Sequence, residues 1–286
     1  MKKLIPWWIK IIIKIVLSRL PIGYELWQRL GLFRHGYMDQ ASYVLNVFNK
    51  HVAKAGLEGK LRGKTILELG PGDSIATALV AASHGANTIL IDAGSFASSN
   101  VEGYRKLVEK LKEKGLNPPD ISAAETIEEI VAVCGARYLT QGLASFESIE
   151  TGTVDLLFSQ AVLEHIRKHE FLKTMQECLR VLCQEGIASH RVDLKDHLGG
   201  ALNNLRFSEY IWESEFFVRS GFYTNRIRFT EMIGLFENTK FIVEVCDVTR
   251  WENLPIKRQL LSDDFIYLSD DDLKVSGFDI LLHKHS

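Results

Sequence analysis

The sequence predicts an α/β protein built on a doubly wound, mainly parallel sheet. From Gly63 onward, short apolar runs alternate with amphipathic stretches, which is the pattern of strand–helix units in such a sheet. Three of the amphipathic stretches stop at a glycine, a residue that commonly ends helices: Gly85, Gly115 and Gly135. Hydrophobic residues make up 46% and charged residues 24% of the 286 residues, as expected for a globular protein with a sizeable core.

The apolar runs and amphipathic stretches predict individual elements in order. The expected strands are Thr65–Leu69, Thr88–Ile91, Ala136–Thr140, Val154–Phe158, Ile187–Arg191, Phe241–Val248 and Gly277–His283. The expected helices are Ile75–Ser83, Ser98–Lys114, Thr126–Val133, His169–Leu182 and Arg228–Glu237. Two further stretches, 193–227 and 249–273, are too long for simple connections and are predicted to be insertions on the substrate side of the sheet.

Residues 1–60 are expected to form a helical extension ahead of a domain that spans 61–286. The run Ile5–Leu17 is apolar except for Lys10 and Lys14, so it is too interrupted for a helix that spans a bilayer. A helix with its lysines on one side and an otherwise apolar surface that includes Trp7 and Trp8 favours a peripheral membrane contact through residues 1–20. The alternatives are packing on its own domain, packing in a homodimer, and a single tilted span.

Composition and charge exclude several classes of protein. The four cysteines, Cys134, Cys178, Cys183 and Cys246, form no CxxC pair, so they are interpreted as reduced thiols in a cytoplasmic protein. The N-terminal helix would place this protein on the inner face of a membrane. Residues 1–35 hold seven basic residues and one acidic residue, although the whole chain has a net charge of -2. The remaining body is therefore acidic, which argues against a nucleic-acid partner.

The most informative motif is a glycine-rich turn after the first expected strand. Gly70 and Gly72 let the backbone turn tightly and approach a ligand, and Asp92 follows the second strand, where a carboxylate can accept both hydroxyls of a ribose. The dinucleotide pattern GxGxxG lacks its third glycine here, because Ile75 stands in its place. Glu68 would repel a pyrophosphate and favour a cation. The motif therefore predicts an adenosine-containing ligand with a positive charge.

This spacing resembles the first two motifs of the class I S-adenosylmethionine (SAM)-dependent methyltransferases. The stretch from Thr153 to Ile166 looks like the fourth strand and following turn of the small-molecule branch of that family, of the type 11 and type 12 kind. The resemblance covers about 61–191, and the strand–helix–strand ending is consistent with it. It implies a seven-stranded, mainly parallel sheet with a reversed last strand, and SAM as cofactor.

The resemblance also implies a role for each matching position. Glu68, Gly70 and Gly72 would line the methionine part of SAM, and Asp92 would hold the ribose. Around the adenosine, the resemblance places Gly94, Ser95, Gln141 and Gly142, and it closes the pocket with Ser159 and Gln160. Two positions depart from the common pattern: Ser74 replaces a frequent third glycine, and Gln141 stands where an acid is common. Arg34 to Met38 are expected to reach the cofactor pocket.

Three residues are candidates for the chemistry at the acceptor. An alcohol acceptor must lose its proton during methyl transfer, and histidine is the natural base near neutral pH. His165 follows the fourth strand, where it acts as the base or shapes the turn. A bend after Arg191 would bring His190 and Asp193 together with Asp196 and His197. His190 and Asp193 would then form a base with its orienting carboxylate, or the group would bind Mg²⁺. The alternative is that these residues are solvated charges in a loop. No metal site is predicted.

The sequence as a whole predicts a methyltransferase that O-methylates a glycan, a lipid-linked saccharide or a similar hydroxylated metabolite. The polar residues of the first insertion, among them Asn204, Asn225, Arg226 and Arg228, are expected to bind such an acceptor. The alternatives are a C- or N-methyltransferase of a lipophilic ring compound and a SAM-fold binding or scaffold protein without turnover.

Overall fold

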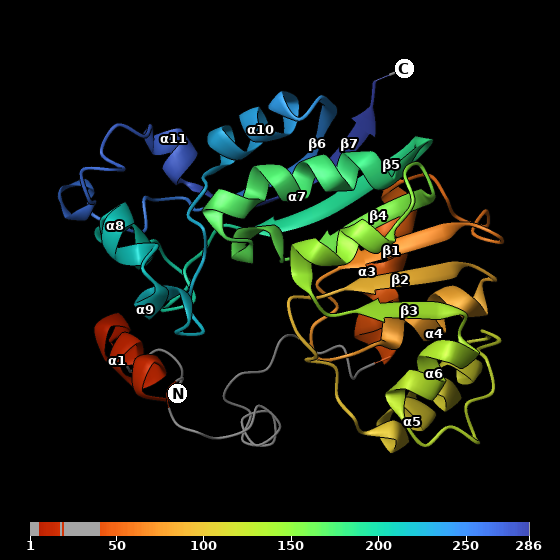
Figure 1. Ribbon diagram of the computed structural model, residues 1–286. Helices are drawn as coiled ribbons and strands as arrows, with labels where there is room; N and C mark the ends of the chain where they lie inside the picture. Colours follow the sequence, from red (N-terminus) through yellow and green to blue (C-terminus); the bar gives the residue numbers. More distant parts are fainter. Residues whose placement is uncertain (1–5, 18, 20–40, 286) are drawn as a thin grey trace.

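A seven-stranded sheet forms the centre of the computed structural model, which describes residues 6–17, 19 and 41–285 (Figure 1). The strand order is β3-β2-β1-β4-β5-β7-β6. All neighbouring pairs from β3 to β5 are parallel, whereas β7 runs antiparallel to both β5 and β6. The doubly wound sheet with a reversed last strand is thus confirmed. The strands are β1 (Thr65–Leu69), β2 (Asn87–Ile91), β3 (Ala136–Leu139), β4 (Val154–Gln160), β5 (Leu182–Asp193), β6 (Phe241–Arg250) and β7 (Val275–Lys284).

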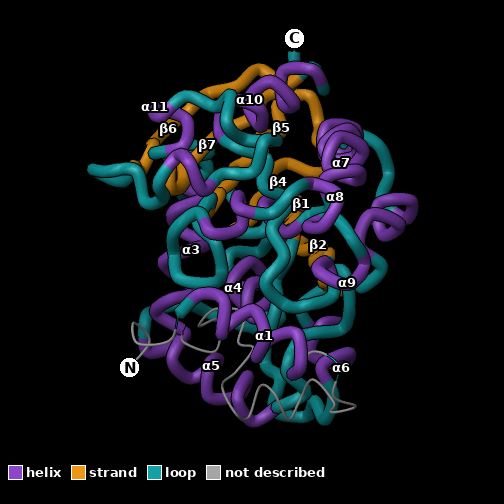
Figure 2. Tube along the Cα trace, turned by 90° about the vertical axis from the view of Figure 1, so that its left-hand side faces the viewer, coloured by secondary structure: helices purple, strands orange, loops and turns teal. Residues whose placement is uncertain are grey.

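Helices cover both faces of the sheet because successive strand residues point to opposite sides. In β1, Ile66 packs in one hydrophobic cluster with α3, α4 and α5, whereas Leu67 packs in another with α7 and α10. Figure 2 shows the strands between α3 on one side and α7 on the other. The helices around the sheet are α3 (Ala41–Lys54), α4 (Ala76–Ser83), α5 (Val101–Glu113), α6 (Ile127–Val133), α7 (Lys168–Val181) and α10 (Phe229–Asn238).

The predicted boundaries are accurate to a few residues, and the differences have local causes. The helix expected from Ser98 begins at Val101, because the Asn100 side chain caps it by accepting a hydrogen bond from the Gly103 N–H at 3.2 Å. The fifth strand begins at Leu182, five residues earlier than expected, since Leu182 already pairs with Val154 of β4. The polar residues Gln184 and Glu185 had hidden this part of the strand.

The two parts of the N-terminal extension pack in different places. Helix α3 lies on the sheet, where the Phe48 ring meets Phe158 of β4 edge-on at 6.3 Å. Helix α1 (Trp7–Leu17) instead lies against the first insertion, with Ile11 buried. None of the described helices is long and apolar enough to cross a membrane. A domain division at residue 60 stays a prediction, and the segment Arg34–Met38 lies outside the described residues.

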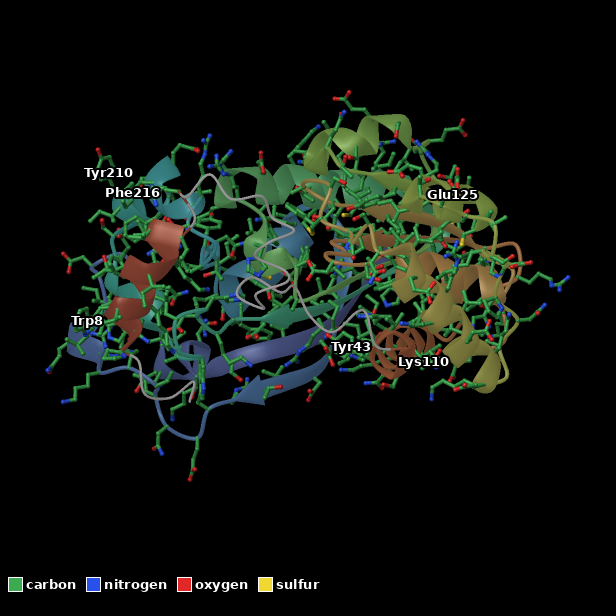
Figure 3. The ribbon with its side chains drawn as sticks, turned by 90° about the horizontal axis from the view of Figure 1, so that it is seen from below. Trp8, Tyr43, Lys110, Glu125, Tyr210 and Phe216 are labelled. Atoms are coloured by element: carbon green, nitrogen blue, oxygen red, sulfur yellow. The ribbon has the colours of Figure 1, made fainter. Side chains whose placement is uncertain are left out.

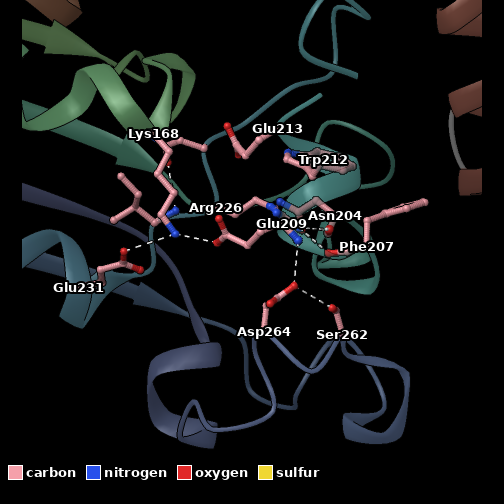
Figure 4. Close-up of polar contacts among 12 residues, drawn as sticks. Lys168, Asn204, Phe207, Glu209, Trp212, Glu213, Arg226, Glu231, Ser262 and Asp264 are labelled. Atoms are coloured by element: carbon pink, nitrogen blue, oxygen red, sulfur yellow. Dashed lines mark hydrogen bonds and ion pairs between the residues drawn. The ribbon is translucent and has the colours of Figure 1, made fainter. Parts of the chain in front are cut away.

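The two insertions contact each other beyond the end of the sheet. The first carries α8 (Glu209–Trp212) and α9 (Glu215–Val218), and the second carries α11 (Asp270–Leu273). Figure 4 shows their polar contacts: Asp264 accepts a hydrogen bond from the Glu209 N–H at 2.8 Å, and Lys168 of α7 pairs with Glu209 at 2.6 Å. Arg226 donates to the Phe207 carbonyl at 2.6 Å. The insertions are therefore held to α7 and to each other.

Arg228 fastens the first insertion to the sheet. Its guanidinium is fully buried and donates to four backbone carbonyls, those of Leu194, Asp272, Leu273 and Val275, at 2.5–3.2 Å. Burial lowers the pKa of Arg228 to about 10, and the nearby Asp272 carboxylate partly opposes this shift. A planar group with five donors suits such a set of acceptors, which a flexible ammonium would not satisfy.

Replacing Arg228 with methionine should therefore destabilise the whole fold. Arg228→Met leaves four carbonyls without their donor and Asp272 without its neighbouring charge, so we expect a loss of about 3 kcal/mol in the free energy of unfolding. Arg219→Met is the matched control, because Arg219 is 80% exposed and its ion pair is with Glu215 at the start of α9, four residues earlier; it should cost less than about 0.5 kcal/mol. Urea denaturation of both variants measures the difference, and equal losses would contradict the anchoring role.

Candidate functional site

The turn after β1 has a backbone that suits glycine. Gly70 and Gly72 adopt positive φ angles of 75° and 64°. A Cβ on Gly70 would lie 2.5 Å from Cγ2 of Val162, in the turn after β4. In that second turn Ala161 also has a positive φ of 55°, although it is not a glycine. Two irregular turns thus meet at the carboxyl edge of the sheet.

Glu68 lies directly before this turn and is buried. It is 2% exposed, and its Oε2 atom has no hydrogen-bond partner among the described residues. Burial raises the pKa of Glu68 to about 8; a hydrogen bond with the Thr77 side chain lowers the pKa, and the nearby Asp92 charge raises it further. A buried carboxylate with an unsatisfied oxygen favours a positively charged or hydrogen-donating ligand.

Asp92 joins the ends of three strands. Its Oδ2 accepts a hydrogen bond from the Gly72 N–H at 2.9 Å, and its Oδ1 accepts one from the Ala93 N–H at 2.7 Å. The Asp92 carbonyl in turn accepts a hydrogen bond from the Gly142 N–H at 2.8 Å, and this bond connects the end of β2 to the turn after β3. The carboxyl ends of β1, β2 and β3 therefore lie together, as the motif predicted.

The remaining residues expected around the adenosine lie in the same loops. Tyr138 of β3 donates from its hydroxyl to the Gly94 carbonyl at 3.3 Å, and Ser95 follows with its side chain exposed. Gln141 is exposed, and it precedes Gly142, whose φ is 54°. These four positions lie in the loops that follow β2 and β3, and the Gly142 N–H joins the second loop to the Asp92 carbonyl.

The last two residues of β4 point to opposite faces of the sheet. Gln160 shares a face with α3, since its Oε1 lies 3.2 Å from Nε2 of His51. Ser159 is fully buried, and its hydroxyl lies 2.7 Å from Nδ1 of His190. Because Glu68 pairs with Phe158 two residues before Gln160, Glu68 and Gln160 share the α3 face. Ser159 thus lies on the opposite face of the sheet from Glu68 and Gln160.

His51 is a polar residue of this face that the sequence analysis missed. Its Nδ1 lies 2.8 Å from the hydroxyl of Ser189, and its ring stacks on Phe158 at 4.9 Å. Burial lowers the pKa of His51 to about 4, so the ring is neutral at pH 7. It sits in an ordinary amphipathic helix without a motif, and no local signal in the sequence could have identified it.

His165 is the exposed histidine of the candidate base residues. It lies in a short 3₁₀ turn, Leu163–His165, and its Nδ1 is 3.0 Å from the Tyr223 carbonyl oxygen. Because a carbonyl oxygen only accepts hydrogen bonds, Nδ1 carries the proton and Nε2 of the neutral ring keeps a lone pair. The ring of His197 stands perpendicular to that of His165, 4.7 Å away. This arrangement suits Nε2 of His165 to proton acceptance.

His190 and Asp193 do not come together, because the expected bend after Arg191 is absent. β5 continues through Asp193. The two side chains are three residues apart in this strand, so they point to opposite faces of the sheet. His190 is fully buried, and burial, followed by the proximity of His51, lowers its pKa to about 3. Asp193 accepts a hydrogen bond from the Lys195 N–H at 3.0 Å. His190 and Asp193 therefore do not form the expected pair of a base and its orienting carboxylate.

Asp196, a Mg²⁺ ligand in one of the alternatives above, instead binds the backbone of its own loop. Its carboxylate accepts backbone N–H bonds from Leu198, Gly199, Gly200 and Asn203, at 2.6–3.0 Å, and a further bond from the Asn203 side chain. In the part of the chain that the structure describes, no cluster of three or more histidine, cysteine or acidic side chains is arranged to hold a metal ion.

The polar side chains of the first insertion mostly bind the protein itself. The expectation that they face an acceptor is wrong for Asn225 and Arg228: the Asn225 amide donates to the Leu163 and Ile166 carbonyls at 2.8 and 2.9 Å, and Arg228 binds the four carbonyls named above. Buried polar groups need internal partners, and long insertions supply many carbonyls that lack strand partners. These residues therefore fix the insertion next to His165.

Comparison with known proteins finds one matching family model and a set of solved structures with a similar fold. Residues 67–189 match the family model described as "Methyltransferase domain", which confirms the resemblance found in the sequence. No curated protein matches the chain.

Three solved structures illustrate the similar folds. The 1,6-didemethyltoxoflavin-N1-methyltransferase of Burkholderia thailandensis is 11% identical, with 83% of this chain and 76% of that chain covered and a TM-score of 0.43. The phosphoethanolamine N-methyltransferase 2 of Haemonchus contortus is 14% identical (83% and 53% covered, TM-score 0.44), so this chain spans about half of its length. A SAM-dependent methyltransferase from Archaeoglobus fulgidus is 10% identical (84% and 94% covered, TM-score 0.45).

The close approach of Val162 to Gly70 predicts that even a methyl side chain at position 70 lowers the stability of the protein. Gly70→Ala should destabilise the protein by about 3 kcal/mol, because the methyl group adds a steric overlap with Val162 to the cost of a positive φ. Gly115→Ala is the control: its φ is 82° and a Cβ there would meet nothing within 4 Å, so about 1 kcal/mol is expected. Urea denaturation compares them, and equal losses would mean that the turn after β4 yields to the methyl group.

Proposed function

We propose that this protein, whose residues 67–189 match a methyltransferase domain, transfers a methyl group from SAM to a hydroxyl group of a small molecule. One observation carries the proposal: a buried carboxylate, Glu68, has an unsatisfied oxygen beside a glycine turn at the carboxyl edge of the sheet. SAM carries an ammonium and a sulfonium, which would supply the missing positive charge, and its sulfonium presents the methyl group for transfer.

The residues around Glu68 fit the other parts of SAM. We assign the methionine part to Glu68, Gly70 and Gly72, and the ribose hydroxyls to the Asp92 carboxylate at the end of β2, whose oxygens are held by the Gly72 and Ala93 N–H groups. Gly94, Ser95, Gln141 and Gly142 would border the adenosine. At the end of β4, Gln160 would close the pocket. Ser159 would contribute indirectly, through its buried contact with His190.

We assign the proton-accepting role to His165. Its Nδ1–H is held by the Tyr223 carbonyl, so its Nε2 is oriented as an acceptor on an exposed turn beside the Gly70 turn. A positioned imidazole is suited to take the proton of a hydroxyl group near neutral pH. Complete burial argues against direct contact between His190 and an acceptor, and Asp193 does not orient it.

A group of positive charges favours an acceptor that is hydroxylated and anionic. On the α3 face, Asp279 of β7 pairs with Lys50 at 2.9 Å, with Lys54 at 2.5 Å and with Arg191 at 3.7 Å. The three cations outnumber Asp279 and its strand neighbour Asp247, which leaves one positive charge in excess close to Gln160, the sheet partner of Arg191. A glycan or lipid-linked saccharide with an acidic group would match this charge better than an uncharged lipophilic ring.

We also propose the peripheral membrane contact through residues 1–20, of which the structure describes 6–17 and 19. It would place the protein at the cytoplasmic face of a membrane. Homodimer packing of the same helix is the alternative. Deleting residues 1–20 is a poor test of either, because the inner face of α1 covers Trp212 and Phe222, which the deletion would expose.

Glu68→Gln tests the cofactor site and gives opposite effects on binding and stability. The folded, ligand-free protein holds the Glu68 proton up to a pH of about 8, whereas the unfolded chain loses it near 4.5, so stability falls as the pH rises between these values. Glu68→Gln should remove this fall and weaken SAM binding by at least about tenfold. Thermal melts from pH 5 to 8 and calorimetry with SAM measure both effects.

Glu164→Gln is the matched control for Glu68→Gln. Glu164 is equally buried, and burial raises its pKa to about 8 as well, although hydrogen bonds with the backbone of Glu164 and Asp193 partly oppose this shift. Its substitution should flatten the pH dependence of stability in the same way but leave SAM affinity unchanged. Unchanged affinity in Glu68→Gln too would contradict the cofactor assignment.

His165→Gln tests the base. We expect turnover to fall by about 100-fold with SAM affinity unchanged, because only proton removal is lost. His169→Gln should keep full activity, since His169 is an exposed histidine on the neighbouring helix. The assay is transfer of a tritiated methyl group from SAM to a fraction of cell extract. Full activity of His165→Gln would favour a carbon or nitrogen acceptor, and no transfer by the unaltered protein would favour a scaffold.

A further inference from the structure

The side chain of Gln160, at the end of β4, is held by a buried histidine of α3. Its Oε1 lies 3.2 Å from Nε2 of His51, and Nδ1 of the same ring lies 2.8 Å from the hydroxyl of Ser189 in β5. His51 is 1% exposed, and its ring stacks on Phe158 at 4.9 Å. The imidazole is therefore fixed against the sheet and connects α3 to two neighbouring strands.

This contact decides which side of the Gln160 amide faces a ligand. A carbonyl oxygen only accepts hydrogen bonds, so Nε2 of His51 carries the proton, and the bare Nδ1 accepts the hydroxyl proton of Ser189. Burial lowers the pKa of His51 to about 4, so the ring carries a single proton at neutral pH. With Oε1 bound to the ring, the NH₂ group of Gln160 is turned away from His51 and offers its donors to a ligand.

The same helix also reaches Glu68 in the next strand, β1. Tyr43 lies in the first turn of α3, and its pKa is raised by burial and further by the Glu68 charge. Figure 3 shows Tyr43 far from Trp8 and Tyr210, so this part of α3 belongs to the sheet and not to the insertions. Glu68 and Gln160 share the α3 face on neighbouring strands, two positions apart. Side chains placed diagonally in this way are about 7–8 Å apart, so both can contact one small group.

The amino-acid part of SAM has two charges to place near Glu68. Its ammonium would meet the Glu68 carboxylate, and its own carboxylate is attached to the same carbon atom, so both charges lie close together. A carboxylate taken out of water needs hydrogen-bond donors. The glycine turn does not supply them, because the N–H groups of Gly70 and Gly72 already donate within the protein, at 2.8 and 2.9 Å, and Pro71 has none. The amide of Gln160 is a donor on the other side of Glu68.

We propose that His51 is a positioning residue for the cofactor: it holds the Gln160 amide so that the NH₂ group donates to the carboxylate of SAM. The inference rests on the proposed function, because it takes SAM as the ligand. Glu68 selects the ammonium, and Gln160, held by His51, selects the carboxylate. The site thereby recognises the whole amino-acid part of SAM rather than any cation, although His51 itself does not touch the ligand.

Two amide substitutions of His51 separate the two contacts of the ring. An asparagine side chain ends near the position of Nδ1, and a glutamine side chain ends near that of Nε2. His51→Asn should therefore keep the contact with Ser189 and release Gln160, whereas His51→Gln should keep the contact with Gln160. Gln160→Met removes the donors themselves at a partly exposed position, so it tests the proposal even if a His51 variant fails to fold.

Calorimetry with three named ligands measures the contact. Decarboxylated SAM keeps the sulfonium and the ammonium, and 5′-methylthioadenosine lacks the whole amino-acid part. The unaltered protein should prefer SAM over decarboxylated SAM by about tenfold, as expected for hydrogen bonds to a charged group. His51→Asn and Gln160→Met should lower this preference to less than about threefold, and His51→Gln should keep most of it. The affinity for 5′-methylthioadenosine should stay the same in every variant.

The matched control is His190→Asn, because His190 is equally buried and contacts a serine, Ser159, on the opposite face of the sheet. It should leave the preference for SAM unchanged. A preference that survives in His51→Asn or in Gln160→Met would overturn the positioning role, and so would equal losses in His51→Asn and His51→Gln. If the unaltered protein bound SAM and decarboxylated SAM alike, this inference alone would fail. If it bound neither SAM nor 5′-methylthioadenosine, the proposed function would fail with it.

Discussion

A carboxylate buried without a compensating charge is the constraint on which the site depends. Glu68 belongs to β1, an interior strand paired on both sides, so its side chain cannot turn to solvent without breaking the sheet. An isolated charge in that position is costly, and the group responds by holding its proton to an unusually high pH. A cationic ligand would reverse this. Glu68 therefore lowers the stability of the ligand-free protein and, at the same time, makes the site prefer a positively charged ligand.

The neighbouring loops are arranged around this carboxylate by backbone hydrogen bonds. Asp92 receives the Gly72 N–H and, through its carbonyl, the Gly142 N–H, so three loops are fixed relative to each other. The turn after β4 is fixed by its close approach to Gly70 and leads directly to His165. The first insertion, anchored by Arg228, then holds the His165 ring through the Tyr223 carbonyl. The cofactor loops, the His165 turn and the first insertion are thus connected to one another in series.

The sequence predicted what depends on local pattern and failed where distant side chains meet. The strands and helices of 61–286 follow from hydrophobic periodicity and from glycines at helix ends, and the glycine turn with Glu68 and Asp92 follows from spacing within about 25 residues. His51 was missed because its partners Ser189 and Gln160 are more than 100 residues away. The uses of Asn225, Arg228 and Asp196 depend on which carbonyls and N–H groups the insertions leave unpaired, which no sequence pattern records.

Proton release on SAM binding tests the role of Glu68 most directly. If Glu68 is protonated in the ligand-free protein and ionises against the cation, binding at pH 6.5 should release about one proton to the buffer, and Glu68→Gln should abolish the release. Calorimetry in buffers of different ionisation enthalpy counts these protons. SAM binding without proton release, or equal release in Glu68→Gln, would contradict the account of the buried carboxylate as the cofactor's charge partner.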